Sequence, residues 1–345
     1  MIIAMQEGCS KAQVGQVISE LREFGLQARV IWPSPKAVLG VVDEMSLGRF
    51  EEVCDAVRDL PGVEEVYDFT TSWKLVSKGF RSQPTEIRLG ECVVGSDEVV
   101  IMAGPCAVES RQAYLELARE LTPLGVGLLR GGAFKPRTSP YSFRGLGEDG
   151  LKIMAEAREV TGLPIVTEVL VPTKVEMVAR YADVLQIGTR NMQNFALLEA
   201  VGDVDKPVLL KRGMMASIKE LLLSAEYILA RGNWQVMLCE RGIRTFETET
   251  RNTLDLSAVP LLKQYTHLPV VVDPSHAAGK RELVPALAAA AVAAGADAVM
   301  VEVHQRPEEA ISDGRQSLTL EGFRDMMDRV RRVGAALGRP IREAA

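Results

Sequence analysis

The segment GGAFKPRTSPYSFRG, residues 131–145, is rich in cations, hydroxyls, glycine and proline, and it has no acidic side chain. Cationic and hydroxyl side chains are the donors that bind phosphate, and glycine lets the backbone approach a ligand closely. The whole chain has a net charge of −6, so the basic character is local. We expect the cations and hydroxyls of this segment to donate to phosphate, and these are Lys135, Arg137, Thr138, Ser139, Ser142 and Arg144.

Further polar residues follow a series of short apolar segments between residues 99 and 304. Repeated strands with intervening helices predict a barrel of parallel strands, in which the C-terminal strand ends meet at one rim and form the active site. The residues at or after these ends are Cys106, Arg130, Glu168, Arg190, Lys211, Arg212, Glu240, Arg241, Asp273, Ser275, His276, Glu302 and His304.

Four residues of this region have side chains that bind metals: Cys106, His276, Glu302 and, in the loop after the last strand, Asp313. A mixed thiolate, imidazole and carboxylate set suits Mn, Fe, Co or Zn better than Mg or Ca. Taken singly, Cys106 could be a small buried side chain and His276 a structural histidine. The prediction of a divalent transition metal site therefore depends on all four residues together.

A second group at the same rim is cationic, and Glu168 and Glu240 balance only part of its charge. Cations near buried strand ends are costly unless they are paired, so the excess predicts a polyanionic ligand that contains phosphate. The members are Arg130, Lys135, Arg137, Arg190, Lys211 and Arg241.

The composition excludes several classes of protein. The 345 residues are 47% hydrophobic and 25% charged, and the negative net charge disfavours binding to nucleic acid or to anionic membranes. No signal peptide and no membrane-spanning segment are expected. The cysteines are odd in number and contain no CxxC pair, which favours a reducing cytoplasm over a disulfide framework. They are Cys9, Cys54, Cys92, Cys106 and Cys239.

The predicted fold class is α/β: a (β/α)8 TIM barrel preceded by a small βαββαβ ferredoxin-like domain. We expect the first domain at 1–75, a linker and β-hairpin at 76–98, and the catalytic barrel at 99–345. The first-domain strands are predicted at 1–6, 28–32, 37–42 and 62–69. The barrel strands are predicted at 99–104, 126–132, 163–169, 184–190, 207–213, 236–242, 268–276 and 298–304.

Long motifs along the whole chain resemble those of a known family. They are GPCAVES, GGAFKPRTSPYSFRGLG, QIGTRNMQN, LLKRGM, CERGIRTFE, TRNTLDLSAVP, VVDPSHAAGKR and VEVHQRPEEAISDGRQSL. The chain closely resembles type I, metal-dependent 3-deoxy-7-phosphoheptulonate (DAHP) synthases with a short ferredoxin-like regulatory domain. The resemblance implies a transferase that condenses phosphoenolpyruvate with erythrose 4-phosphate, releases phosphate and opens the shikimate pathway to chorismate and the aromatic amino acids.

The resemblance also implies roles for individual residues. Lys135 is expected to protonate the new alkoxide, directly or through a metal-bound water, and Cys106 and His276 join it in the catalytic set. The implied metal ligands are Cys106, His276, Glu302 and Asp313. The implied phosphoenolpyruvate contacts are Arg130, Lys135, Arg190, Lys211 and Arg241, and the implied sugar-phosphate contacts are Lys135, Arg137, Thr138 and Ser139; Gly188, Thr189 and Glu240 complete the expected substrate-binding set.

Tyrosine or phenylalanine is the implied inhibitor, and a homotetramer is the implied assembly. The first domain has a simpler interpretation as a packing module.

Two other functions stay open. A 3-deoxy-8-phosphooctulonate synthase runs the same chemistry on arabinose 5-phosphate, but it usually has a KANRSS-like loop in place of KPRTSP and lacks the first domain. A non-catalytic aromatic amino acid sensor is the second. A separate chorismate mutase partner and an oxidative pairing of Cys239 with Cys106 are further hypotheses.

Overall fold

The computed structural model describes residues 1–31, 36–43, 45, 47–67, 73–136, 139 and 141–343. The chain forms two compact units. One consists of Met1–Pro84 with Tyr265–His267, and the other of Thr85–Gln264 with Leu268–Ala345. The domain limits expected from the sequence stay a prediction.

The first unit is a four-stranded antiparallel sheet with two helices. Its elements are β1 (Ile2–Met5), α1 (Lys11–Glu23), β2 (Ala28–Ile31), β3 (Val38–Val41), α2 (Leu47–Arg58) and β4 (Val63–Tyr67), with strand order β2-β3-β1-β4. Helix α1 begins at a capping box, in which the Ser10 side chain accepts from the Gln13 amide and the Gln13 side chain accepts from the Ser10 amide. The predicted βαββαβ order is confirmed. The predicted strand residues Trp32 and 68–69 lie outside the described residues.

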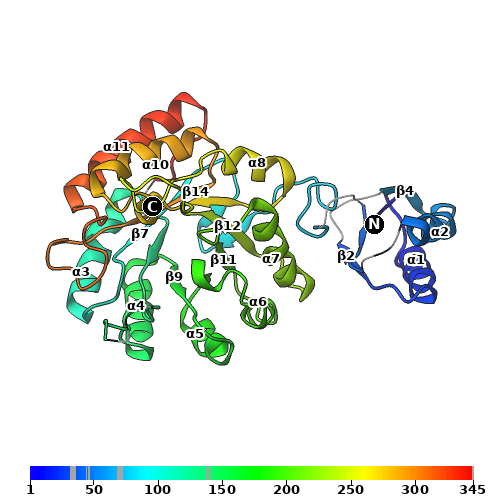
Figure 1. Cartoon of the computed structure of the whole chain (residues 1–345), viewed down its shortest axis with the longest axis horizontal. Helices are drawn as coiled ribbons and strands as arrows, with labels where there is room; N and C mark the ends of the chain where they lie inside the picture. The colour runs from blue at the N-terminus through cyan, green and yellow to red at the C-terminus, as the bar shows by residue number, and fades with distance from the viewer. Residues whose placement is uncertain are drawn as a thin grey trace. The chain divides into compact units, whose positions relative to one another are not determined.

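The second unit is a closed barrel of eight parallel strands, so the predicted (β/α)8 barrel is confirmed (Figure 1). Strand β14 pairs with β7 and closes the ring. The strands are β7 (Val100–Gly104), β8 (Leu128–Arg130), β9 (Ile165–Glu168), β10 (Val184–Ile187), β11 (Val208–Lys211), β12 (Val236–Glu240), β13 (Val270–Val272) and β14 (Ala298–Glu302).

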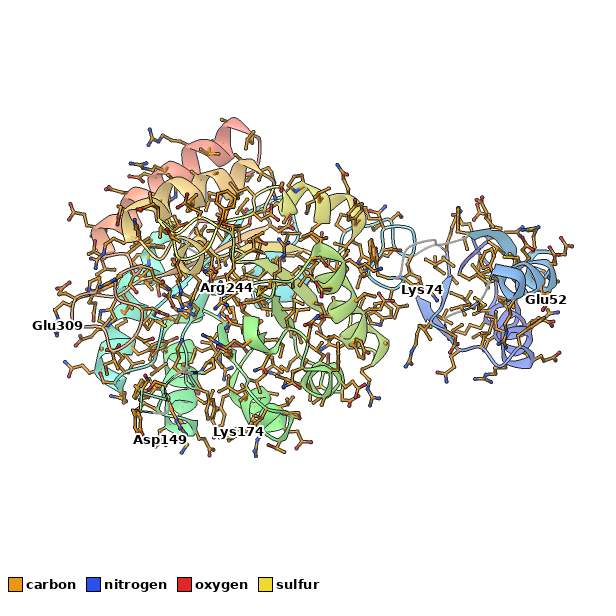
Figure 2. The ribbon with its side chains drawn as sticks, viewed as in Figure 1. Glu52, Lys74, Asp149, Lys174, Arg244 and Glu309 are labelled. Atoms are coloured by element: carbon orange, nitrogen blue, oxygen red, sulfur yellow. The ribbon has the colours of Figure 1, made fainter. Side chains whose placement is uncertain are left out.

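Helices surround this barrel, and α10 and α11 lie side by side on its outside (Figure 1). Charged side chains such as Asp149 and Glu309 stand on the outer surface of the unit (Figure 2). None of the described helices is long and apolar enough to cross a membrane. The helices are α3 (Arg111–Leu121), α4 (Glu148–Thr161), α5 (Val175–Tyr181), α6 (Phe195–Gly202), α7 (Ile218–Ala230), α8 (Ala258–Tyr265), α9 (Pro274–Ala278), α10 (Val284–Ala293) and α11 (Leu320–Ala336).

Most of the predicted barrel strands end before the residue expected, and the differences are largest at β13 and β10. Strand β13 stops at Val272, because the Asp273 side chain caps α9 and Pro274 occupies its first turn. His276 therefore lies on a helix and not on a strand. Strand β10 stops at Ile187, and Gly188 leads into a single 3-10 turn, Thr189–Asn191.

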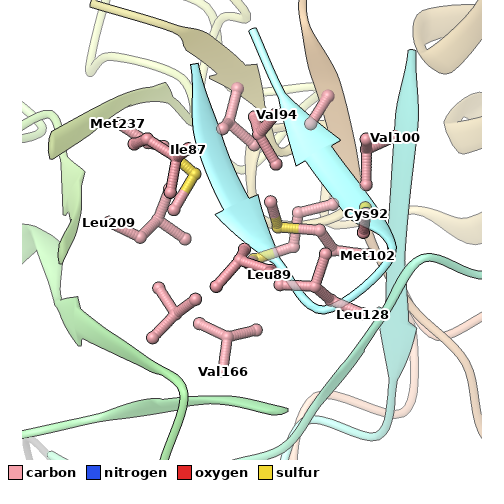
Figure 3. Packing of buried hydrophobic residues seen from close by; sticks show 14 of the residues in the cluster. Ile87, Leu89, Cys92, Val94, Val100, Met102, Leu128, Val166, Leu209 and Met237 are labelled. Carbon is pink, nitrogen blue, oxygen red and sulfur yellow. The ribbon is translucent and has the colours of Figure 1, made fainter. Parts of the chain in front are cut away.

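A β-hairpin before the barrel fills one end of its interior. Strands β5 (Ile87–Leu89) and β6 (Cys92–Val94) place apolar side chains in the same cluster as residues near the N-terminal ends of the barrel strands (Figure 3). Val100, Leu128 and Val166 are examples from the barrel. Because the hairpin occupies the N-terminal end, the C-terminal end is the one left for a ligand.

At the start of β14, a buried carboxylate connects three parts of the barrel. Asp297 accepts hydrogen bonds from the Val270 amide at 2.7 Å and from the Lys263 ammonium group at 2.7 and 2.8 Å. Arg339 lies 3.5 Å from the same carboxylate. Asp297 itself is only 1% exposed.

We expect Asp297→Ala to lower the free energy of unfolding by about 3 kcal/mol, because it leaves the Val270 amide and the Lys263 cation without their partner. Urea unfolding measures the change. Asp203→Ala is the matched control, because Asp203 pairs with Arg231 at the surface, and it should cost at most about 1 kcal/mol. Equal losses in the two variants would contradict the role of Asp297.

Candidate active site

A cavity of about 350 Å³ lies at the C-terminal ends of the barrel strands. Six cations line it, and they come from different strands and loops. Lys211 is deeply buried at the end of β11, whereas Arg190 is exposed on the 3-10 turn after β10. The six are Arg130, Lys135, Arg190, Lys211, Arg241 and Arg251.

Most of the predicted substrate-binding residues line this cavity, and Glu240 does not. Arg137 and Thr138 lie outside the described residues. Glu240 is fully buried, and its two carboxylate oxygens accept from the Gly242 amide at 2.6 Å and from Arg212 at 2.8 Å. The predicted residues that line the cavity are Arg130, Lys135, Ser139, Gly188, Thr189, Arg190, Lys211 and Arg241.

Two of these arginines have nitrogens that are buried without a partner. Among the described residues, the only buried side-chain nitrogens and oxygens that lack a hydrogen bond are Arg130 Nε and Arg241 Nε and Nη1. Burial lowers the pKa of Arg241, so the cation is poorly solvated. An unsatisfied buried donor costs about 1–3 kcal/mol, and more when it is charged. An anionic ligand would supply the missing acceptors.

Glu168 lies among the cations of the cavity wall. Burial raises its pKa, and the charges of Lys135 and Lys211 oppose the rise. Gly188 is necessary beside it, because a Cβ atom at this position would lie 1.9 Å from Glu168 Oε1. The sequence predicted Gly188 as a substrate contact. The structure shows that its lack of a side chain also leaves room for Glu168.

The four predicted metal ligands lie together at one side of the cavity. One ligand atom from each of Cys106, His276, Glu302 and Asp313 lies within 4.8 Å of the others. Cys106 Sγ is 3.3 Å from Asp313 Oδ2, and His276 Nε2 is 3.3 Å from Glu302 Oε1. A thiol, an imidazole and two carboxylates converging on one point fit a divalent transition metal.

The electrostatics of this cluster also suit a metal. Burial raises the pKa of Cys106 to about 12, so the thiol loses its proton only when a cation binds. Burial lowers the pKa of His276, which keeps the imidazole neutral and able to bind. Burial acts to raise the pKa of Glu302, but His276 in its protonated form and the charge of Arg130 bring it down to about 2. Glu302 is therefore ionised at neutral pH.

Asp273 orients the histidine of the cluster. Its Oδ1 accepts from the His276 amide at 2.9 Å, and its Oδ2 lies 2.7 Å from His276 Nδ1. The same Oδ2 also accepts from the Lys211 ammonium group. This arrangement directs His276 Nε2 toward Glu302, as a carboxylate behind a ligating histidine commonly does.

Lys135 lies between the cations and the ligand cluster. Its Nζ donates to the Cys106 carbonyl oxygen at 3.0 Å. Burial acts to lower the pKa of Lys135, but the thiolate form of Cys106 and the carboxylates of Glu302 and Glu168 raise it above its ordinary value. Lys135 therefore carries a proton at neutral pH that it can donate to a nearby oxyanion.

Sequence reasoning missed several residues of the cavity wall. Arg251 is the most important, because its guanidinium group lies 3.2 Å from Asp313 Oδ1. It comes from the irregular segment after β12, where no periodic pattern indicates which side chain points inward. The other missed residues are Pro136, Gln186 and Met214, whereas Ser142 was among the loop hydroxyls expected to bind phosphate.

The chain matches two family descriptions. Residues 80–335 match the DAHP synthetase I family, and residues 1–70 match the DAHP synthase ferredoxin-like domain. Together the two matches account for most of the chain, and they correspond to the barrel and to the small antiparallel domain.

Several known proteins are similar to the chain. A phospho-2-dehydro-3-deoxyheptonate aldolase of Thermotoga maritima is 46% identical over 98% of this chain and 99% of its own length. The crystal structure of the DAHP synthase of the same organism superposes with a TM-score of 0.78 and covers 99% of this chain and 98% of that one. A 2-dehydro-3-deoxyphosphooctonate aldolase of Acidithiobacillus ferrooxidans is 34% identical over 66% of this chain and 86% of its own length.

The resemblance seen in the sequence motifs is therefore confirmed over nearly the full length. The chain belongs to the DAHP synthetase I family and carries the ferredoxin-like domain of DAHP synthases at its N-terminus.

Proposed function

We propose that the chain condenses phosphoenolpyruvate with erythrose 4-phosphate to give DAHP and phosphate, and so opens aromatic amino acid biosynthesis. The observation that carries the proposal is one cavity that combines unpaired buried arginine nitrogens with a thiol, imidazole and carboxylate cluster. The first feature suits a substrate with phosphate and carboxylate groups, and the second suits activation of an aldehyde oxygen.

The cations divide between the two substrates. Arg130, Lys211 and Arg241 are buried at strand ends and bind the phosphate and carboxylate of phosphoenolpyruvate, with Arg190 at the cavity mouth. The sugar phosphate binds to the loop of Lys135 and Ser139, which lies on the same wall, and to its neighbours Arg137 and Thr138. Two bound anions hold the reacting carbons at a fixed distance, which lowers the entropic part of the barrier.

The resident metal is held by Cys106, His276, Glu302 and Asp313, whose ligand atoms converge. A divalent transition metal bound there supplies a Lewis acid for the aldehyde oxygen of erythrose 4-phosphate. Mn, Fe, Co and Zn all suit these ligands, and the donor set does not distinguish among them.

The reaction forms a carbon–carbon bond and a carbon–oxygen bond from water, and it breaks the carbon–oxygen bond between C2 and the phosphate group. C3 of phosphoenolpyruvate attacks the aldehyde carbon, and positive charge develops at C2. Lys135, protonated beside Cys106, donates a proton to the new alkoxide. Water adds at C2 and loses a proton, and the resulting hemiketal phosphate releases inorganic phosphate to give the ketone.

The octulosonate synthase alternative is weaker. Its relatives match about two thirds of this chain, whereas the heptulosonate relative matches both domains. A non-catalytic sensor is disfavoured as well. The described residues of the predicted cation set line one cavity, and the predicted metal ligands lie together at its wall.

We further propose that the ferredoxin-like domain is a regulatory domain. It binds tyrosine or phenylalanine, and this binding inhibits the reaction in the barrel as feedback control. The match of residues 1–70 to the DAHP synthase ferredoxin-like domain supports this role. A homotetramer in the cytoplasm is the proposed form, and the unbridged thiols of Cys9, Cys92, Cys106 and Cys239 suit that compartment. A separate chorismate mutase is a candidate partner.

The reaction itself is tested by following the loss of phosphoenolpyruvate absorbance in the full-length protein. We expect turnover with erythrose 4-phosphate, no turnover after EDTA treatment, and recovery when Mn²⁺ or Co²⁺ is added. Activity with arabinose 5-phosphate but not with erythrose 4-phosphate would assign the chain to the octulosonate synthases. Binding of tyrosine without turnover on either sugar would favour the sensor.

Arg241 tests the anion site through stability. Phosphoenolpyruvate at about 100 times its Kd should raise the free energy of unfolding by about 2.7 kcal/mol, measured as a higher Tm. Arg241→Met should weaken binding by about 100-fold and remove most of that shift at the same ligand concentration. Arg231→Met is the control, since Arg231 pairs with Asp203 at the surface, and it should keep the full shift. A full shift in Arg241→Met would refute the assignment.

Lys135→Met tests the proton donor. We expect kcat to fall by about 10²- to 10⁴-fold, while the variant still binds one metal ion per chain, because Lys135 is not a ligand. Metal content after dialysis and steady-state kinetics measure the two effects. Lys152→Met, at the exposed surface of α4, should keep the wild-type kcat. A near-normal kcat in Lys135→Met would exclude the role.

A further inference from the structure

Each of the two carboxylate ligands directs one oxygen to the cluster. For Glu302 this is Oε1, which lies 2.7 Å from Arg130 Nη1 and 3.3 Å from His276 Nε2. For Asp313 it is Oδ2, which lies 3.3 Å from Cys106 Sγ. The second oxygens, Glu302 Oε2 and Asp313 Oδ1, accept hydrogen bonds from two residues that are not in the cluster, one for each oxygen.

That pair is Gln316 and Arg251. Gln316 Nε2 donates to Glu302 Oε2 at 2.5 Å, and Arg251 Nη1 donates to Asp313 Oδ1 at 3.2 Å. Arg251 Nη1 also donates to Gln316 Oε1 at 2.9 Å, which joins the two contacts. A guanidinium, an amide and a carboxylate thus form one chain of hydrogen bonds, in which each bond polarises the next.

The amide of Gln316 can only serve in one orientation. Its oxygen faces a cation and its nitrogen faces a carboxylate, so a flipped amide would place like groups together at both ends. Gln316 is 2% exposed, so water cannot replace either contact easily. The residue therefore fixes the side-chain direction of Glu302.

The backbone beside Arg251 is attached to the helix that carries the histidine ligand. The Arg251 amide donates to the Ala278 carbonyl oxygen at 3.1 Å, and Asn252 Nδ2 donates to the His276 carbonyl oxygen at 3.1 Å. The contact is close, because a Cβ atom at Gly279 would lie 2.6 Å from Arg251 Cβ. Residues 251–252 thus attach α9 to Asp313 directly and to Glu302 through Gln316.

Asp313 itself needs such support. Its φ is +54°, and it is the only non-glycine residue with a positive φ among those that the structure describes. A left-handed backbone at such a residue is strained, and it persists where surrounding contacts hold it. Gln316 and Ser317 supply two of these contacts, since the backbone amide of Gln316 and the Ser317 hydroxyl both donate to the Asp313 carbonyl oxygen.

We propose that Arg251 and Gln316 form a clamp that holds Glu302 and Asp313 with one oxygen each toward the metal position, and so sets the affinity of the site for its metal. Both are positioning residues. The inference rests on the proposed ligation by Cys106, His276, Glu302 and Asp313. By occupying the second oxygen of each carboxylate, the clamp favours binding through a single oxygen and prevents either side chain from turning away.

Arg251 also lines the substrate cavity, so a contact with substrate is the competing explanation for its position. Gln316 separates the two roles, because it is buried behind Glu302 and does not line the cavity. A clamp predicts that both residues change metal binding when no substrate is present. A substrate contact predicts that neither does.

The experiment is a titration of the full-length, metal-free protein with Co²⁺ alone. The charge-transfer absorption of a cobalt–thiolate bond reports ligation by Cys106, and it does not depend on activity. We expect Gln316→Met and Arg251→Met each to raise the Kd for Co²⁺ by about 10- to 100-fold. The double variant should lose less than the product of the two, because both residues act in one hydrogen-bonded chain.

Lys280→Met is the matched control. It removes a cation that follows α9, and the Lys280 ammonium group pairs with Glu249 and not with a ligand of the cluster. The Kd of this variant for Co²⁺ should stay within about twofold of the wild-type value, since solvent and salt screen an exposed charge that does not contact the ligands. Arg251→Lys keeps the charge without the planar fork, so it should recover only part of the affinity.

Two results would overturn the clamp. If wild type shows the thiolate band but both clamp variants bind Co²⁺ within about twofold of it, the ligands stand and the clamp is wrong. If the wild-type protein shows no cobalt–thiolate band, or if the band persists in Cys106→Ala, the assignment of Cys106 as a ligand is wrong, and the clamp falls with it. Thermal unfolding checks that each variant is folded. If Gln316→Met does not fold, Arg251→Met alone tests the clamp, because the Arg251 side chain is 40% exposed and its replacement leaves the core intact.

Discussion

The buried carboxylate of Asp273 is the interaction on which both halves of the site depend. It has no exposed surface, yet it binds the Lys211 ammonium group and His276 Nδ1, and it caps the helix on which His276 lies. The charges of His276 and Lys211 hold the pKa of Asp273 well below its usual range, against the effect of burial. Lys211 belongs to the anion-binding wall and His276 to the ligand cluster, so one side chain sets the geometry of the two relative to each other.

Such a concentration of charge is possible because the barrel separates its two ends. The hairpin β5–β6 and the first residues of the strands form an apolar cluster at the N-terminal end (Figure 3). The C-terminal end then carries charged groups whose partners are incomplete, as the unpaired nitrogens of Arg130 and Arg241 show. Stability is supplied by one end of the barrel, and the other end keeps donors that only a ligand satisfies.

A second charged network supports the wall without lining it. Arg212 donates to Glu240 and to Asp255, in both cases at 2.8 Å, and it also donates to the Ala216 carbonyl oxygen. These contacts join the ends of β11 and β12 to the segment that follows β12. Arg241 lies directly after Glu240, so the pairing of Arg212 with Glu240 holds the backbone from which Arg241 reaches the cavity. Glu240, expected from the sequence to balance the cations of the rim, thus pairs with Arg212, which does not line the cavity.

The sequence by itself determined the order of the elements and the chemistry available at the rim. Apolar segments of strand length recur with polar residues after them, and this pattern follows from local burial, which adjacent residues already specify. The tertiary structure decided which of these polar residues face one another. Lys211 turns to Asp273 and the adjacent Arg212 to Glu240, since neighbouring side chains leave a strand on opposite sides. Arg251 reaches Asp313 across 62 positions of the chain, and no local pattern encodes a contact that depends on the path of two loops.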